Sequence, residues 1–463
     1  MATMNRLFAA LLLLVAACTS PDAVTTTPNA PLETAPPAPD PTAANPDTEV
    51  EVRGCNSPPV TFSPLCEIFD LLEDWYVDAP VDPELLAGIA VEGLDRYTTT
   101  ETEDPPRTLF CAIPHRAFIP LCDALVARVD AEHIPVGDAV EAAMAHMIDI
   151  GLDPFTYYLP PEQAGSLRLN GIVGGIGVLL DARDAAGSKC TRITEVCELE
   201  VVMVLEDNPG SRAGILPGDV ITAVDGENVA GKGFTEVVTL ISGDESGPVE
   251  ITVRRAGAEA SYTIERSELA TPNVGFAVPV GGVGYLRIPD FEFDVPRLVS
   301  DSLDQILAQD PGTIVVDLRD NPGGYIDSVV AVAGLFIDGG VVMSSESPTG
   351  PYEYPATAGG PATSQRLIVL VNQGTASAAE VLAGALRDRR NAVVIGSDTF
   401  GKDAVQILFD LRNGGEFYVA VARWSTPSGD TVADGGLTPD VEVIWPSGAT
   451  VEEIVERALE ATP

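Results

Sequence analysis

Ser377 and Lys402 are the residues of this 463-residue chain whose types and spacing best suit chemistry. Lys402 is one of only three lysines, and it follows Ser377 by 25 positions. A serine hydroxyl needs a neighbouring base, and the chain's histidines, His115, His133 and His146, all lie far upstream. A buried lysine can lose its proton and act as a base, whereas arginine stays protonated. The pair therefore predicts a serine nucleophile with a lysine base.

The composition excludes several classes of partner and cofactor. The 69 acidic residues give a net charge of -43, which repels phosphate backbones and anionic lipid head groups at long range. We therefore expect no nucleic acid partner and interpret the acidic residues as a solvated surface. Cysteine spacings of eleven and seven fit no metal knuckle or redox motif, so we expect neither a metal nor another cofactor.

The first eighteen residues resemble a bacterial lipoprotein signal peptide. Arg6 precedes an apolar run over residues 7–15, and small residues then lead to Cys18 in the sequence Val-Ala-Ala-Cys. The run is too short to span a membrane as a mature helix, so we expect its removal after export and a lipid on Cys18. An ordinary secretory peptide cleaved nearby is the alternative. Both predict export, and the lipid would anchor the protein to a membrane of the bacterial cell envelope, in the periplasm and at the outer membrane.

The six remaining cysteines fall into close pairs along the chain. Six cysteines allow fifteen connectivities, and proximity in sequence favours local pairing. An exported protein meets the oxidising conditions in which disulfides persist. We therefore predict three structural disulfides, which are Cys55–Cys66, Cys111–Cys122 and Cys190–Cys197.

Two regions precede the candidate chemistry. Residues 19–50 are rich in Pro, Thr, Ala and Asp and predict a disordered tether, because they cannot bury enough apolar surface to fold. Residues 51–165 look like an internal duplication with a period of 56, since the segment 62–66 recurs as 118–122 with matching cysteines. We interpret them as two helical modules, each held by a disulfide, and as a candidate surface for a homodimer. Chance similarity between two proline-rich cysteine loops is the alternative.

Residues 168–268 change to short β-branched runs separated by glycine turns, which predicts a β-rich domain. The glycine-rich loop at 174–178 and the later runs 208–215 and 218–221 occur in the order found in PDZ domains, which the region resembles over its whole length. A PDZ domain binds a peptide C-terminus with backbone N–H groups and adds the peptide as a strand, here beside residues 177–180. The residues expected to bind the peptide are Gly174, Gly175, Ile176, Gly177 and Val178.

Residues 273–463 alternate apolar strands with amphipathic helices, which predicts a layered α/β core around the candidate chemistry. The expected strands cover residues 284–288, 313–318, 367–371 and 392–395. The expected helices cover residues 295–307, 326–336, 376–387 and 450–461.

The order of motifs resembles the carboxyl-terminal processing, or tail-specific, proteases of serine peptidase family S41. The matching segments span residues 145–445 and are 152–159, the PDZ motifs, 317–324, 374–380, 399–406, 426–429 and 436–440. This resemblance implies a crotonase/ClpP-like α/β catalytic core with an inserted β-rich PDZ domain and an N-terminal helical region. It also implies an endopeptidase that recognises protein or peptide substrates by their apolar C-termini and cleaves them through an acyl-enzyme.

The resemblance assigns roles to individual residues. The catalytic residues are Ser377 as nucleophile, Lys402 as general base and Gln406 as the residue that orients the lysine. The expected oxyanion donors are the backbone N–H groups of Gly323, Gly324 and Ala378. Asp388 matches an acidic position of the family and is given a supporting role.

Two positions depart from the family pattern, because Asp403 replaces the glycine after the lysine and Ala379 replaces a small hydroxyl residue. A carboxylate at Asp403 would favour protonated Lys402, which predicts activity at moderately alkaline pH or only after a conformational change. Two other functions stay open. One is a catalytically inactive scaffold that binds peptide tails; the other is a crotonase-type acyl-CoA enzyme, against which export and the PDZ insertion argue.

Overall fold

The computed structural model describes residues 49–462 except 56–62, 107, 162–163, 165–171, 174, 184–189, 191, 195, 205–207, 243–246, 267–273, 279–281, 434 and 446–448. The predicted signal peptide, Cys18, the tether up to residue 48, and Gly174 lie outside the described residues. Within the described part of the chain, no helix is both long enough and apolar enough to cross a membrane.

The α/β core is built on a sheet with the strand order β11–β12–β13–β16–β17–β20. Neighbours from β12 to β20 pair in parallel, and β11 is antiparallel to β12. The strands are β11 (Gly275–Ala277), β12 (Val283–Arg287), β13 (Thr313–Asp317), β16 (Arg366–Val371), β17 (Val393–Gly396) and β20 (Val441–Glu442). Ile314, Val315 and Val316 are all fully buried, as expected for a parallel strand covered on both faces.

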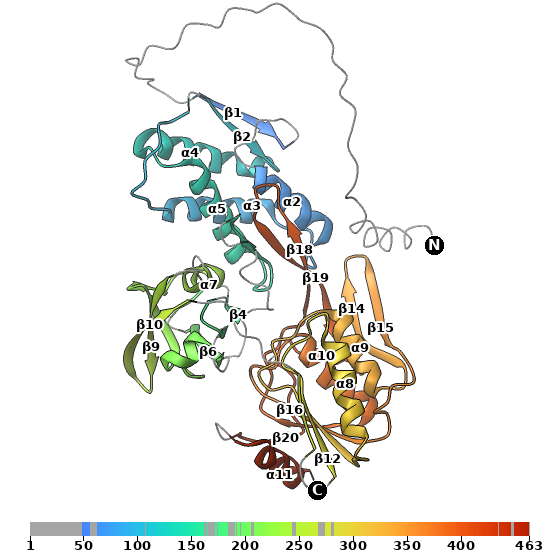
Figure 1. Ribbon diagram of the computed structural model, residues 1–463. Coiled ribbons are helices and arrows are strands. Elements are labelled where there is room, and N and C mark those ends of the chain that lie inside the picture. Colours follow the sequence, from blue (N-terminus) through green and yellow to red (C-terminus); the bar gives the residue numbers. More distant parts are fainter. Residues whose placement is uncertain are drawn as a thin grey trace, which may run out of the picture. The chain divides into compact units, whose positions relative to one another are not determined.

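Helices pack on both faces of this sheet. Those of one face are α8 (Val295–Leu307), α9 (Ile326–Phe336) and α10 (Ala378–Arg390), grouped together in Figure 1, and that of the other is α11 (Val451–Ala461). Side chains alternate along β13, so Ile314 and Val316 pack with α8 to α10, whereas Val315 packs with α11. The predicted layered α/β core is confirmed.

A second sheet, absent from the sequence prediction, has the antiparallel order β15–β14–β19–β18, and β3 also pairs with β19. Its strands are β3 (Tyr157–Leu159), β14 (Gly340–Ser347), β15 (Gly350–Ala356), β18 (Ala404–Asp410) and β19 (Glu416–Ser425). Buried positions alternate with partly exposed ones along much of β19, and its apolar run over residues 417–422 was not used in the sequence prediction. β18 begins two residues after Lys402, so this sheet holds the lysine end of the candidate site.

The N-terminal region consists of two similar modules, each a strand followed by two helices. The first has β1 (Glu49–Gly54), α2 (Ser63–Trp75) and α3 (Pro83–Arg96); the second has β2 (Thr108–Ile113), a short 3-10 turn (Arg116–Phe118), α4 (Ile119–Glu132) and α5 (Val136–Gly151). β1 and β2 pair in parallel. The Cys55–Cys66 and Cys111–Cys122 disulfides occupy corresponding places in the two modules. This repeated order supports the predicted duplication, although the prediction lacked both strands.

The helical region shares its core with the β18–β19 hairpin. Leu411, Phe417 and Val419 belong to the same buried cluster as side chains of α2 and α5. The Val77 backbone N–H also donates to the Ala420 carbonyl over 2.8 Å. The helical region and this hairpin of the α/β region are therefore separate in sequence but share one hydrophobic core.

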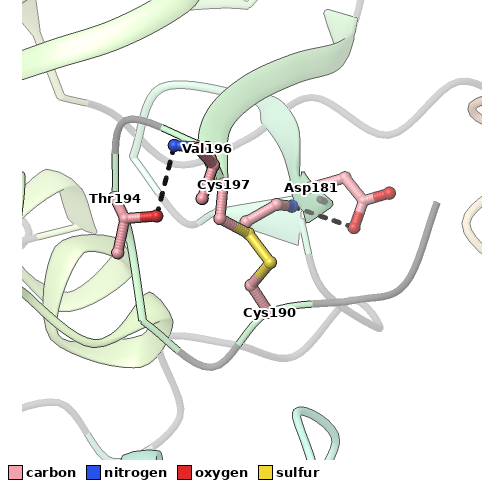
Figure 2. Close-up of a disulfide and its surroundings, with 6 residues drawn as sticks. Asp181, Cys190, Thr194, Val196 and Cys197 are labelled. Atoms are coloured by element: carbon pink, nitrogen blue, oxygen red, sulfur yellow. Dashed lines mark hydrogen bonds between the residues drawn. A yellow bond between two sulfur atoms is a disulfide. The ribbon is translucent and has the colours of Figure 1, made fainter. Parts of the chain in front are cut away.

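The PDZ-like region forms a sheet with the order β10–β9–β7–β6–β5–β4, and β8 pairs with β7. Its elements are β4 (Ile172–Val173), β5 (Val178–Arg183), β6 (Glu198–Val204), α6 (Pro209–Ala213), β7 (Val220–Val224), β8 (Glu227–Asn228), α7 (Phe234–Ser242), β9 (Pro248–Arg255) and β10 (Ala258–Glu265). The Cys190–Cys197 disulfide closes the connection between β5 and β6, where the Val196 N–H donates to Thr194 Oγ1 (Figure 2). All three predicted disulfide pairings are thus confirmed.

Candidate active site

Ser377 lies at the turn between β16 and α10, directly before the helix begins. Its φ is 53°, in the region that residues with a side chain rarely adopt. Such backbone strain concentrates at functional sites, where the surrounding structure holds it in place. The Ser377 N–H donates to Glu380 Oε2 over 2.8 Å, which fixes the turn.

The glycine loop after β13 lies against this serine. A Cβ on Gly323 would lie 2.8 Å from the Ser377 Cβ and 2.9 Å from the Ala378 nitrogen, so no larger residue fits. The Gly323 N–H donates to Asn321 Oδ1 over 2.8 Å. Because this bond occupies the Gly323 N–H, the predicted oxyanion donors that remain are the N–H groups of Gly324 and Ala378. Gly323 has no side chain and so allows the loop to approach Ser377 closely.

A buried ion pair holds the start of the same loop. Asp317 is fully buried at the end of β13, and its carboxylate accepts from Arg319 Nε over 2.8 Å and from the Tyr285 hydroxyl over 2.6 Å. Burial raises the pKa of Asp317, but Arg319 and Tyr285 outweigh burial and hold that pKa below its usual range. The ion pair therefore keeps its charges and fixes the chain direction before Asn321.

Glu380 contacts both predicted catalytic segments, although the sequence prediction did not include it. It is fully buried, and its Oε1 accepts from the Thr399 hydroxyl and from the Gly401 N–H. Its Oε2 accepts both the Ser377 N–H, over 2.8 Å, and the Lys402 N–H, over 2.9 Å. One carboxylate oxygen thus joins the backbones of the predicted nucleophile and the predicted base. The sequence signal was present, because a glutamate three residues after a serine that opens a helix is the capping-box pattern.

Lys402 lies in a buried environment, on the segment that connects β17 to β18. The residue is 6% exposed, and its carbonyl accepts from Trp424 Nε1 over 2.9 Å. Its Nζ lies 5.9 Å from the centre of the Phe155 ring. Phe155 comes from the predicted family segment 152–159, so that segment forms part of the lysine's surroundings.

Gln406 is on β18, and its side-chain amide donates to the Phe155 carbonyl. Its predicted role as the residue that orients Lys402 stays a prediction. Phe155 links the two residues, because its carbonyl accepts from Gln406 and its ring faces the Lys402 amine.

Asp388 lies on α10, eleven positions after the serine. Its carboxylate accepts from the Ser428 N–H over 2.9 Å and from the Ser428 hydroxyl over 2.8 Å. Burial raises the pKa of Asp388, but these bonds and the nearby Arg387 outweigh burial and lower it. Asp388 thus holds the turn after β19, and its predicted supporting role stays a prediction.

The Asp403 carboxylate forms an ion pair with Arg423. Arg423 Nη1 lies 3.2 Å from Asp403 Oδ1, and its other terminal nitrogen lies 3.1 Å from Asp78. Burial raises the pKa of Asp403, and Arg423 opposes that rise. This pairing weakens the expected effect of Asp403 on Lys402.

The peptide-binding loop of the PDZ-like region has the backbone that the glycines predict. Gly175 and Gly177 have φ values of 85° and 73°, and Ile176 and Val178 are buried. The edge of β5 is partly occupied, because Ile172–Val173 pairs with Val178 and Leu179 in antiparallel fashion. A peptide cannot pair at these two positions while β4 stays in place.

The site combines a serine of strained backbone with a glycine loop that lies against it. An α/β core with such a site and an inserted PDZ domain is typical of one class of serine peptidase. The model of peptidase family S41 matches residues 282–443, and that of the PDZ domain matches residues 200–255. A carboxy-terminal-processing protease of Bartonella bacilliformis is 30% identical over 332 residues, covering 69% of this chain and 73% of the relative. A carboxyl-terminal-processing protease of Synechocystis is 32% identical over 302 residues, covering 64% of this chain and 68% of the relative. The chain therefore belongs to the carboxyl-terminal-processing proteases, which are serine peptidases.

A solved structure supports the same assignment. The photosystem II D1 C-terminal processing protease is 27% identical and superposes with a TM-score of 0.57. The match covers 78% of this chain and 93% of that protein. The fold of an S41 peptidase with a PDZ domain and N-terminal helices, expected from the sequence, is confirmed.

Proposed function

We propose that the protein is an exported endopeptidase in which Ser377 and Lys402 form the catalytic dyad. The observation that carries this proposal is the Glu380 oxygen that accepts the backbone N–H groups of both residues. It joins two residues that are 25 positions apart in sequence at one point of the fold. The strained backbone of Ser377 supports its role as the nucleophile.

In the proposed reaction, the Ser377 oxygen bonds to the carbonyl carbon of the substrate while its proton passes to the neutral Lys402 amine. The N–H groups of Gly324 and Ala378 stabilise the negative oxygen that forms. Protonated Lys402 then gives the proton to the departing amine, the C–N bond breaks, and an ester remains on Ser377. Water, deprotonated by Lys402, hydrolyses the ester and releases the second product.

Cleavage of an unfolded test protein with an apolar C-terminal tail tests this proposal. The purified protein is expected to cut it, and the Ser377→Ala variant is expected to bind the tail without cutting. If the unaltered protein binds the tail but cuts nothing at neutral or alkaline pH, the scaffold function is favoured instead.

We also propose that the PDZ domain captures substrate C-termini and that tails compete with β4. Ile172 lies opposite Leu179 and Val173 opposite Val178, on the sheet edge where a tail would pair. α7, which borders a PDZ peptide groove, contacts β4. A tail must therefore displace β4 to reach these positions, which lowers its apparent affinity.

Replacing both Ile172 and Val173 with proline is expected to raise the affinity for an apolar C-terminal peptide by about tenfold, because proline cannot maintain the competing pairing. Fluorescence anisotropy of a labelled peptide measures the change. The same peptide with an amidated C-terminus is the control, since it lacks the carboxylate. An unchanged affinity for the free-carboxylate peptide contradicts competition by β4.

The proposed location depends on the N-terminal sequence. We propose that Cys18 carries a lipid that anchors the protein in the cell envelope, on the outer membrane and in the periplasm. The apolar run over residues 7–15 and the small residues before Cys18 support it. Labelled fatty acid should enter the protein in a bacterial host and be lost in Cys18→Ser. Label in both proteins, or in neither, contradicts the proposal.

A further inference from the structure

Phe293 and Tyr325 form a stacked aromatic pair on the surface beside the candidate site. Their ring centres lie 3.8 Å apart, and the ring planes meet at 21°. Phe293 is 74% exposed and Tyr325 is 43% exposed. The pair thus offers a flat apolar surface to solvent, a feature that typically marks a contact site for another molecule when it borders a functional site.

Backbone hydrogen bonds connect this pair to the glycine loop. The Phe291 N–H donates to the Gly323 carbonyl over 2.8 Å, and the Tyr325 N–H donates to the Phe291 carbonyl over 2.9 Å. The Phe291 side chain is fully buried and anchors the segment that carries Phe293. Both rings therefore stand on backbone that is bonded directly to the loop beneath Ser377.

The distance from the site to the pair suits a neighbouring residue of a bound peptide. A Cβ on Gly323 would lie 2.8 Å from the Ser377 Cβ, so Gly323 touches the nucleophile. Tyr325 follows Gly323 by two residues, which is about 7 Å along an extended chain. An extended substrate whose carbonyl carbon lies at Ser377 covers the same distance within two residues, so side chains close to the scissile bond can reach the pair.

The segment that carries Phe293 is acidic, which restricts what the pair can bind. Asp290, Glu292 and Asp294 come from the same segment as Phe293. Burial raises the pKa of both Asp290 and Glu292, and the neighbouring carboxylates add to that rise. These carboxylates would repel an acidic substrate side chain, whereas the stacked rings would favour an apolar one.

We propose that Phe293 and Tyr325 bind an apolar substrate side chain next to the scissile bond and so determine the specificity of cleavage. The inference rests on the proposed peptidase function, because it takes Ser377 as the point of attack. It concerns residues of the catalytic region and is independent of the PDZ domain, which binds the substrate terminus.

Peptide binding to the full-length Ser377→Ala protein tests the inference without turnover. The probes are two labelled peptides that differ only in leucine or aspartate beside the scissile bond of a peptide that the unaltered protein cuts, or at their centre if none is cut. Both peptides are amidated, so that the PDZ domain has no carboxylate to bind. In the Ser377→Ala background, Phe293→Ala and Tyr325→Ala are each expected to weaken binding of the leucine peptide by about tenfold. Binding of the aspartate peptide is expected to be weak throughout, and Phe293→Leu is expected to keep part of the leucine preference.

Tyr352→Ala is the matched control, because Tyr352 is 51% exposed, contacts another tyrosine and lies on β15. It is expected to change neither affinity. Leucine-peptide binding that is unchanged in Phe293→Ala, an equal loss for both peptides, or a change of oligomeric state in that variant overturns the inference. Cleavage by the unaltered protein separates the two ideas. Binding that depends on Phe293 without any cleavage refutes the peptidase and leaves the pair as a peptide-binding surface with no role in cleavage. Cleavage with no dependence on Phe293 refutes only the specificity surface.

Discussion

Replacing Lys402 with arginine is expected to lower kcat/KM for peptide cleavage by at least about a thousandfold. Arginine keeps the positive charge but stays protonated, so it cannot accept the Ser377 proton. The lysine backbone should keep its place, because its N–H and carbonyl are bound by Glu380 and Trp424. The initial rate of hydrolysis of a fluorogenic peptide measures the effect.

Lys232→Arg is the control for this variant. Lys232 lies in the PDZ-like region, where its amine is 2.8 Å from both Glu227 and Glu236. Arginine can make the same ion pairs, so the cleavage rate should stay near that of the unaltered protein. A folded Lys402→Arg variant that keeps more than about a tenth of the activity contradicts the role of Lys402 as the base.

Replacing Glu380 with glutamine is expected to lower kcat by about a hundredfold or more while KM changes little. The side chain keeps its size, but an NH₂ group replaces one of two oxygens that accept hydrogen bonds. Either the Ser377 and Lys402 N–H groups or the Thr399 and Gly401 donors then face another donor. We expect the free energy of unfolding to fall by about 2–4 kcal/mol, because buried donors lose their acceptor.

Two measurements distinguish positioning from a general loss of structure. Chemical denaturation gives the stability, and activity is measured well below the unfolding midpoint, with Glu353→Gln, an exposed glutamate on β15, as the control. Burial also raises the pKa of Glu380 against the opposing hydrogen bonds. As the pH falls, the Glu380 carboxyl should therefore gain its proton before an ordinary glutamate would. The unaltered enzyme is expected to begin losing activity at that higher pH. A stably folded Glu380→Gln variant with full activity refutes the positioning role.

Much of the α/β core could be predicted from the sequence because its elements are strongly patterned. α8 and α9 begin and end at the predicted residues, since each carries apolar side chains toward one core. β13 and β16 could be located because both faces are buried and the strands read as apolar runs. The local disulfides followed from proximity along the chain.

The antiparallel sheet and the contacts within the site could not be predicted in the same way. β19 contains an apolar run over residues 417–422, but its partners follow only from the fold, because it pairs with β3, which lies far upstream in sequence, as well as with β18. The capping-box pattern indicates that Glu380 contacts the Ser377 backbone, but its contact with the Lys402 backbone could not be predicted, because only the fold brings the two residues close. Phe293 and Tyr325 are likewise 32 positions apart, and no pattern indicates that their rings stack.

Covalent labelling with a fluorophosphonate tests the central claim, that Ser377 is an activated nucleophile, most directly. The protein is incubated with the reagent at several pH values, and peptide mass spectrometry locates the adduct. We expect one adduct on Ser377 in the unaltered protein and a rate of labelling lower by about a hundredfold or more in Lys402→Arg. No adduct on Ser377, or equal rates in both proteins, would contradict the account.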